Sequence, residues 1–238
     1  ESIAPWTRST GLNVTFLDDC AGERYLESAW GSRFVSAFRS LRSGAFKCDF
    51  LRLAYIADRG GFYADTDSCA ADVTLETLRQ RAARSNASLI LTESYWKPNG
   101  KRFNFNGFFA ARPKHAALIR LVHMAVDNIE QRLGANFSAK SPAPGFCDCA
   151  TGCCAMAIAG PALMHHLFKE PDTLVLPEVD RGEVFDPASK RTVLTKCKKD
   201  ATKAVYWEKQ FARNQIYWPE GSSPTSACTR AHSEVQAD

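Results

Sequence analysis

The alternation of strand-like runs with helix-length runs constrains the fold of this chain more than any other feature. Residues 49–58 are almost wholly apolar, and Gly60-Gly61 ends this run just before the strand-like "FYADTD". The same reading of periodicity predicts a helical or turn-like segment over 23–43 and further helices over 74–84, 115–133 and after the turn at 159–161. It predicts further strands over 12–17, 88–94, 105–113 and 173–178. Strands and helices that alternate predict an α/β layered fold with a largely parallel central sheet.

The length of 238 residues fits one domain that spans 1–238. Within it we expect a cysteine-rich loop at 138–154 and a loosely ordered tail at 219–238. The net charge of +4 is small and spread along the chain, which excludes a nucleic-acid footprint. No apolar run approaches the roughly 18 residues of a membrane span, so we expect membrane attachment only through a segment outside this chain.

Nine cysteines are many for a reduced compartment, and four of them crowd into "CDCATGCC" at 147–154. Structural disulfides and a zinc site both remain open on this composition, although the spacing lacks a CxxC…CxxC pair. Three glycosylation sequons favour disulfides and the secretory pathway, and they begin at Asn13, Asn86 and Asn136. Because nine is odd, at least one cysteine has no disulfide partner within the chain.

The run "FYADTD" carries the first candidate site. Side chains alternate along a strand, so Tyr63, Asp65 and Asp67 are expected on one face. Two carboxylates at the carboxyl end of a strand suit Mg²⁺ or Mn²⁺ that carries a diphosphate. The alternative is a solvated strand end with no ligand.

The expected helix before this run carries the second candidate site. Asp49 and Arg52 are three residues apart and therefore share one face of an otherwise apolar helix. Charges on a largely buried helix are costly unless they meet each other or a ligand. A first-turn acid paired with an arginine is the purely structural alternative.

Together these two segments, "KCDFLRLAYIADRGGFYADTD" at 47–67, resemble the signature of glycosyltransferase family 32. They are also similar to the catalytic core of the glucosylating clostridial toxins. Lys47, Asp49, Arg52, the glycine pair, Tyr63, Asp65 and Asp67 carry the resemblance. Weaker similarity continues through "NGFFAARPKHAALIRL", "AGPALMHHL" and "LPEVDRGEVFDP".

This resemblance implies a GT-A fold, with a Rossmann-like mixed central sheet flanked by helices. It implies a retaining enzyme that moves a hexose from a UDP- or GDP-sugar. Asp65 and Asp67 would bind Mn²⁺ (or Mg²⁺), with Asp65 also near the donor's ribose or sugar. Asp49 and Arg52 would hold the donor sugar, with Arg52 near the diphosphate, and Tyr63 and Asn106 would line the donor-sugar pocket.

The resemblance fails in two places. Residues 1–11 lack the opening strand that helps such enzymes seat the nucleotide base, and Tyr206 stands where the family has a metal-closing histidine. Three functions are therefore weighed. The first is a Golgi-type or secreted glycosyltransferase with a glycan, glycolipid or glycoprotein acceptor. The others are a toxin-like protein glucosyltransferase and a degenerate member that binds a nucleotide or glycan without turnover.

Overall fold

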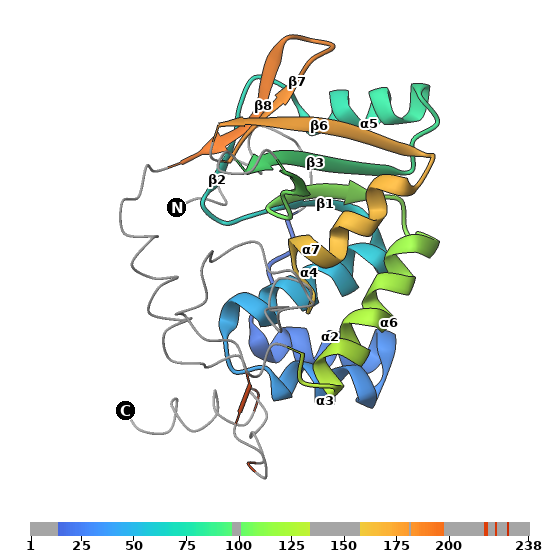
Figure 1. Ribbon diagram of the computed structural model, residues 1–238, viewed down its shortest axis with the longest axis vertical. Helices are drawn as coiled ribbons and strands as arrows, with labels where there is room; N and C mark the ends of the chain where they lie inside the picture. Colours follow the sequence, from blue (N-terminus) through green and yellow to red (C-terminus); the bar gives the residue numbers. More distant parts are fainter. Residues whose placement is uncertain are drawn as a thin grey trace. The chain divides into compact units, whose positions relative to one another are not determined.

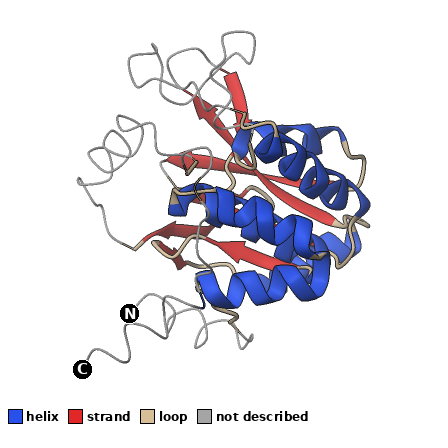
Figure 2. Ribbon diagram, turned by 90° about the horizontal axis from the view of Figure 1, so that it is seen from below, coloured by secondary structure: helices blue, strands red, loops and turns tan. Residues whose placement is uncertain are grey.

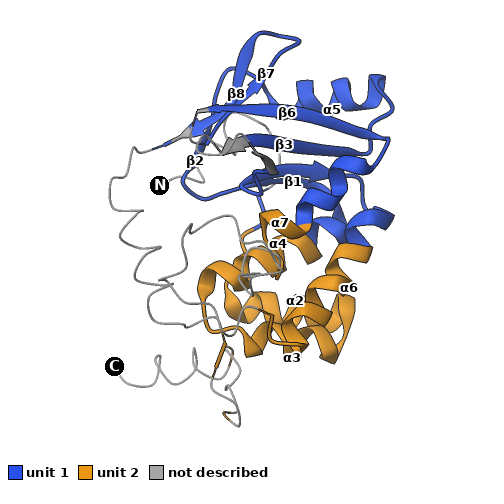
Figure 3. Ribbon diagram, in the orientation of Figure 1, with its two compact units in different colours: residues 1–15, 55–119, 164–201 blue, residues 16–54, 120–163, 202–238 orange. Residues whose placement is uncertain are grey.

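The computed structural model describes residues 14–96, 101–133, 158–180 and 182–197, and four single residues, Tyr217, Trp218, Ser222 and Cys228. The chain forms two compact units, shown in Figure 3. Unit 1 comprises 1–15, 55–119 and 164–201, and unit 2 comprises 16–54, 120–163 and 202–238. The single catalytic domain expected from the length stays a prediction.

Unit 1 contains the eight-stranded sheet, most of whose strands are labelled in Figure 1 and whose strands are drawn in red in Figure 2. Seven strands follow the order β1-β5-β3-β6-β7-β8-β2, and β4 also pairs with β3. Their bounds are β1 Gly61–Ala64, β2 Ser68–Ala70, β3 Leu89–Trp96, β4 Lys101–Asn104, β5 Phe108–Ala111, β6 Thr173–Asp180, β7 Glu183–Asp186 and β8 Arg191–Lys196.

The strand directions confirm a mixed sheet but contradict the largely parallel sheet that the alternation predicted. Among the described strands, only β3 and β6 pair in parallel, whereas the other pairings are antiparallel. The strands β2, β4, β7 and β8 were not predicted, because their sequences lack a clear period-2 pattern. Short connections favour the antiparallel pairing of β6 with β7 and of β7 with β8.

One face of this sheet packs against α5 (Leu75–Arg84). The hydroxyl oxygen of Thr74 accepts a hydrogen bond from the Thr77 amide and so begins the helix. Leu78 of α5 joins a buried cluster with the strand residues Ile90, Phe108 and Leu176. The even-numbered residues of β3 and β5 therefore face α5 in this region, and the odd-numbered residues face the other way.

Unit 2 is built from helices. They are α2 (Asp19–Trp30), α3 (Ser32–Ser40), the first part of α4 (Gly44–Arg59) and most of α6 (Ala116–Glu130). Asp18 caps α2 by accepting a hydrogen bond from the Ala21 amide at 2.7 Å. Gly31, with φ of 88°, then turns the chain from α2 into α3. Buried Phe34 and Phe50 stack with their ring centroids 6.5 Å apart and fix α3 on α4.

Most of the predicted elements are confirmed, and one is wrong. The helices at 49–58, 74–84 and 115–133 and the strands at 88–94, 105–113 and 173–178 are present with shifted ends. After the 159–161 turn come α7 (Pro161–Met164) and the 3-10 helix η3 (His165–Lys169). The strand expected at 12–17 is absent from its described part, 14–17, where Val14 and Phe16 are exposed and Asp18 already caps α2.

Two disulfides confirm the expected disulfide bonding for four of the nine cysteines. Cys20 pairs with Cys228 in unit 2, and Cys69 pairs with Cys197 in unit 1. The cysteine-rich loop at 138–154 lies outside the described residues, as does the 219–238 tail except for Ser222 and Cys228. Two disulfides are compatible with a secreted or lumenal protein.

Candidate active site

The glycine pair positions the first candidate site at the start of β1. Gly60 and Gly61 have φ of 68° and 98°, which side chains other than glycine rarely adopt. The amide of Gly60 closes α4 by donating to the carbonyl of Ile56 at 2.9 Å. A Cβ on Gly60 would lie 2.6 Å from the backbone nitrogen of Pro113. Only glycine therefore allows α4 to end and β1 to begin within two residues.

Tyr63 and Asp65 lie on one side of the chain, as strand alternation predicts. The Tyr63 hydroxyl donates a hydrogen bond to Oδ1 of Asp65 at 2.9 Å. The backbone of Asp65 extends the pairing of β1 with β5, because its amide donates to the carbonyl of Gly107 at 2.9 Å. Asp65 is thus held at two points: its backbone amide bonds to the Gly107 carbonyl, and its carboxylate bonds to the Tyr63 hydroxyl.

Asp67 does not lie on the strand, and here the sequence prediction is wrong. β1 ends at Ala64, and Thr66 and Asp67 form a turn that the Ser68 amide closes on the carbonyl of Asp65 at 2.9 Å. Strand alternation therefore cannot place Asp67 on the face of Asp65. The two acids instead flank a tight turn, and both are half-buried.

A second strand pair anchors this turn on its far side. The amide of Cys197 donates to the carbonyl of Asp67 at 2.9 Å, and β2 pairs with β8 from Ser68 onward. The Cys69–Cys197 disulfide joins the same two segments covalently. The cysteine count alone gave no sign of this arrangement, because disulfide partners cannot be read from spacing.

The predicted donor-site residue Asn106 lies in a turn next to Asp65. Asn106 and Gly107 interrupt the run from β4 to β5. A Cβ built on Gly107 would lie 2.7 Å from Oδ2 of Asp65 and 2.4 Å from the Phe105 ring. Glycine at 107 is therefore what allows the Asp65 carboxylate to lie against this turn.

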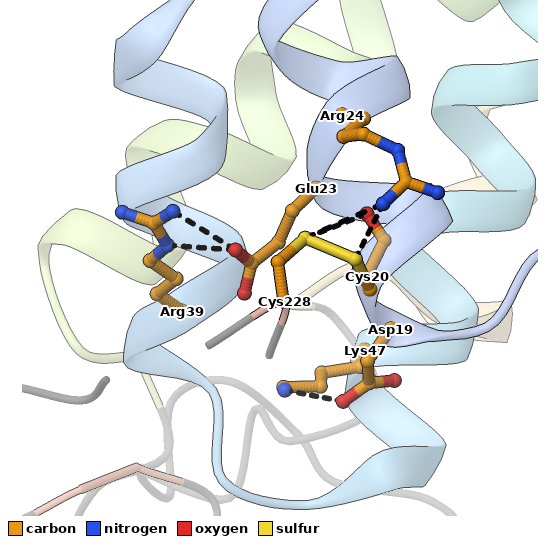
Figure 4. Close-up of polar contacts among 7 residues, drawn as sticks. All are labelled: Asp19, Cys20, Glu23, Arg24, Arg39, Lys47 and Cys228. Atoms are coloured by element: carbon orange, nitrogen blue, oxygen red, sulfur yellow. Dashed lines mark hydrogen bonds and ion pairs between the residues drawn. A yellow bond between two sulfur atoms is a disulfide. The ribbon is translucent and has the colours of Figure 1, made fainter. Parts of the chain in front are cut away.

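The second candidate site, Asp49 with Arg52, forms within unit 2. An Arg52 guanidinium nitrogen lies 2.6 Å from Oδ1 of Asp49 along one face of α4. Their side chains are only 9% and 16% exposed, respectively, which confirms a nearly buried charge pair. Figure 4 shows the neighbouring pair of Lys47 with Asp19, joined at 2.7 Å. Lys47 also lies over the Phe38 ring, so it has a structural role in this unit.

Other contacts in Figure 4 show how α2 is fixed within unit 2. Glu23 is only 4% exposed, and its carboxylate accepts hydrogen bonds from Nε and a terminal nitrogen of Arg39 at 3.1 and 2.9 Å. The Cys20–Cys228 disulfide attaches the first turn of the same helix to a residue far along the chain. The Glu23–Arg39 pair holds α2 to α3, and the Lys47–Asp19 pair joins α2 to α4.

Asp65 and Asp67 offer carboxylate oxygens, which are suitable ligands for a divalent metal ion. Within the part of the chain that the structure describes, no three His, Cys, Asp or Glu side chains gather into a metal-binding group. Mg²⁺ and Mn²⁺ are commonly held by one or two carboxylates, with substrate phosphates and water as the other ligands. The two-carboxylate set therefore fits such a cation.

Sequence reasoning missed one further residue, which lies just before the turn at Asn106 and Gly107. Asn104 ends β4 and is fully buried, yet neither its Nδ2 nor its Oδ1 hydrogen-bonds to any residue within the described ranges. A single asparagine in a strand-like run gives no signal of burial. Residues 1–11 and Tyr206, where the family resemblance fails, lie outside the described residues.

Comparison with known proteins gives one match. Residues 11–83 match the model of a family described as "Glycosyltransferase sugar-binding region containing DXD motif". No curated protein and no solved structure matches the chain. Among the described residues, no helix is long and apolar enough to cross a membrane. The matched range includes Asp49, Arg52 and the Asp65-Thr66-Asp67 turn, and it supports membership of the glycosyltransferases that carry a DXD motif.

Proposed function

We propose that this protein is a retaining, divalent-metal-dependent glycosyltransferase that moves a hexose from a UDP- or GDP-sugar. The acceptor is a glycan, glycolipid or glycoprotein, and the expected architecture is the GT-A type. One observation carries the proposal: the DXD motif of the matched region coincides with a turn whose first carboxylate is fixed by Tyr63. A solvated strand end would need no such support.

Asp65 and Asp67 would hold Mn²⁺ or Mg²⁺ in this proposal. When bound, the cation supplies positive charge beside the diphosphate, which becomes more negative as the sugar leaves. Tyr63 restricts Asp65 to one orientation and lowers the entropy lost when a ligand binds.

The remaining roles rest on the family resemblance. Asp49 and Arg52 contact the donor, Asp49 through sugar hydroxyls and Arg52 also near the diphosphate, and Tyr63 and Asn106 border the donor sugar. The acceptor oxygen bonds to the anomeric carbon while the bond from that carbon to the phosphate oxygen breaks. The acceptor's proton passes to the departing phosphate, and both bonds lie on the same face of the sugar, which retains the configuration.

Several features support action in the secretory pathway, with the Golgi lumen as the proposed compartment. The two disulfides need an oxidising environment to persist. Asn86, the sequon asparagine within the described residues, is exposed just after α5. The disulfides and sequons also favour a lumenal acceptor over the cytosolic proteins that a toxin-like enzyme would modify.

Calorimetry with UDP- and GDP-sugars, with and without Mn²⁺, followed by a product assay, tests the proposal. We expect Mn²⁺-dependent binding and transfer, which Asp65→Ala and Asp67→Ala abolish. Asp72→Ala is the matched control, because it removes an exposed carboxylate from the same unit. Binding without product would indicate the degenerate, non-catalytic alternative. Unchanged transfer by the Asp65 and Asp67 variants would refute the site.

A further inference from the structure

Asn104 carries a buried side-chain amide that lies within the described sheet and makes no hydrogen bond there. Its side chain is 0% exposed, and neither of its polar atoms has a hydrogen-bond partner among the described residues. Burial of an unpaired amide costs free energy, because the amide loses its hydrogen bonds to water. Buried polar groups without partners are rare in native proteins and call for a physical explanation.

The strand register shows which side of the sheet Asn104 faces. Asn104 lies opposite Glu93 in the antiparallel pair of β4 with β3, so the two side chains share one face. Glu93 has the same parity as Leu89, whereas Ile90 packs on the α5 side. Asn104 therefore lies on the sheet face opposite α5.

Tyr63 lies on this same face. It pairs with Phe109 in the register of β1 with β5, and their ring centroids are 5.6 Å apart. Phe109 has the opposite parity to Phe108, which packs in the α5-side cluster. Asn104 and the Tyr63–Asp65 pair thus belong to one face of one sheet.

The distance along the chain is also short. Gly107, whose carbonyl accepts a hydrogen bond from the Asp65 amide, is three positions after Asn104. An extended chain advances at most about 3.3–3.6 Å per residue, so Asn104 lies within roughly 11 Å of that carbonyl. The Phe105 amide donates to the carbonyl of Thr92 at 2.8 Å and holds the intervening turn to β3.

We propose that Asn104 binds hydroxyl groups of the donor sugar and is a sugar-recognition residue of this protein. An amide offers one carbonyl acceptor and an NH₂ donor, and this pairing complements a hydroxyl, which both donates and accepts. A phosphate accepts only, and a metal ion would use only the amide oxygen. The inference rests on the proposed function, because the donor must bind beside Asp65.

The test uses Asn104→Leu, which replaces the amide with an apolar side chain of similar size. A panel of UDP-glucose, UDP-galactose, UDP-N-acetylglucosamine and GDP-mannose is titrated with Mn²⁺, alongside UDP and GDP. For the nucleotide-sugar that binds the unmodified protein, we expect Asn104→Leu to lower the affinity by about tenfold or more. Binding of the nucleoside diphosphate should be unchanged, and the melting temperature should not fall. Ser94→Ala, on the opposite face of β3, is the control.

Each outcome decides the inference. Equal loss of sugar-nucleotide and diphosphate binding would overturn it, because the amide would then serve the nucleotide or the metal. Full nucleotide-sugar binding by Asn104→Leu would also overturn it, while loss by Asp67→Ala would leave the proposed function standing. If no nucleotide-sugar binds the unmodified protein, the proposed function itself fails.

A second measurement covers the case in which Asn104→Leu does not fold. The milder Asn104→Ser is titrated with donors that each lack one sugar hydroxyl. Removal of the recognised hydroxyl should weaken binding by the unmodified protein but cause little further loss in Asn104→Ser. Additive losses for every hydroxyl would contradict the inference.

Discussion

The hydroxyl of Tyr63 donates a 2.9 Å hydrogen bond to Oδ1 of Asp65, across the end of β1. Two residues on one strand face are thereby joined at the point where the chain turns toward Asp67. The bond selects one orientation of the Asp65 carboxylate before any ligand binds.

Removal of this hydroxyl should reduce activity without unfolding the protein. For Tyr63→Phe we expect transfer to fall about tenfold, because the loss of one hydrogen bond to a charged group costs about 1.5 kcal/mol or more. The measurement is kcat/KM for transfer at saturating Mn²⁺. Tyr55→Phe, which removes a hydroxyl bonded to Thr15 in the same unit, should have no such effect.

Gly107 should tolerate no side chain without a loss of function. Alanine there would force the Asp65 carboxylate and the Phe105 ring to move, since both lie within 3 Å of the new Cβ. Both obstacles are side-chain ends, so we expect weaker Mn²⁺-dependent binding with only a small loss of stability. Titration calorimetry and thermal melting separate the two. Gly44→Ala, which meets nothing within 4 Å, should bind normally.

The two disulfides should differ in their effect on the candidate site. Either one is expected to stabilise the fold by about 2–4 kcal/mol. Only Cys69–Cys197 adjoins the turn, where the Cys197 amide holds the carbonyl of Asp67. Replacement of that pair by serines should therefore weaken Mn²⁺-dependent donor binding, measured well below the melting temperature. Serines at Cys20 and Cys228 should lower stability but leave Mn²⁺-dependent donor binding unchanged. An equal loss of donor binding in both double-serine variants would contradict this prediction.

The Asp49–Arg52 pair should show strong energetic coupling. Each side chain is nearly buried, so Asp49→Leu alone breaks a nearly buried ion pair and should cost about 3–5 kcal/mol of unfolding free energy. The double variant with Arg52→Leu should recover most of this loss, as judged by urea denaturation. It should still fail to bind donor, since the proposed sugar contacts are gone. Donor binding by the stable double variant would exclude the pair from the site.

Asp172 provides a prediction about pH. The Ser88 hydroxyl donates to its carboxylate and lowers the pKa of Asp172 below its ordinary value of 3.8, and nearby His115 lowers it further. A lowered pKa in the folded state means stability that is present above pH 4 and is lost as the pH falls through the folded-state pKa.

Ser88→Ala should raise the pKa of Asp172 and shift acid unfolding to higher pH. Carboxyl NMR titration measures the pKa directly. Because Ser88 also completes the Asn86 sequon, Asn86→Gln is the matched control, and it should leave the titration of Asp172 unchanged. A normal pKa for Asp172 in the unmodified protein would contradict the assigned cause.

Local sequence patterns predicted most of the helices and the charge pair. Asp49 and Arg52 meet because a helix repeats every 3.6 residues, and this geometry needs no knowledge of the rest of the chain. Tyr63 and Asp65 meet for the equivalent reason in a strand. The glycine pair likewise predicted a sharp local change of backbone direction, and the positive φ angles of Gly60 and Gly61 confirm it.

The prediction failed where the outcome depended on distant residues. β1 ends before Asp67, and the strand that follows, β2, pairs with β8, a segment more than a hundred positions later in the sequence. The order of the strands in the sheet and the disulfide partner of Cys69 likewise depend on which distant segments come together in the folded chain. No periodicity within a short window contains that information.

The sequence by itself therefore determined most of the helices, the glycine junction and the residue types of a two-carboxylate site. Tertiary structure alone decided that the Asp65 carboxylate lies against Gly107, that a disulfide joins the segment after Asp67 to Cys197, and that Asn104 is buried without a hydrogen-bond partner among the described residues. The physical reason is that backbone periodicity acts over a few residues. Burial and pairing are properties of segments that meet only when the chain folds.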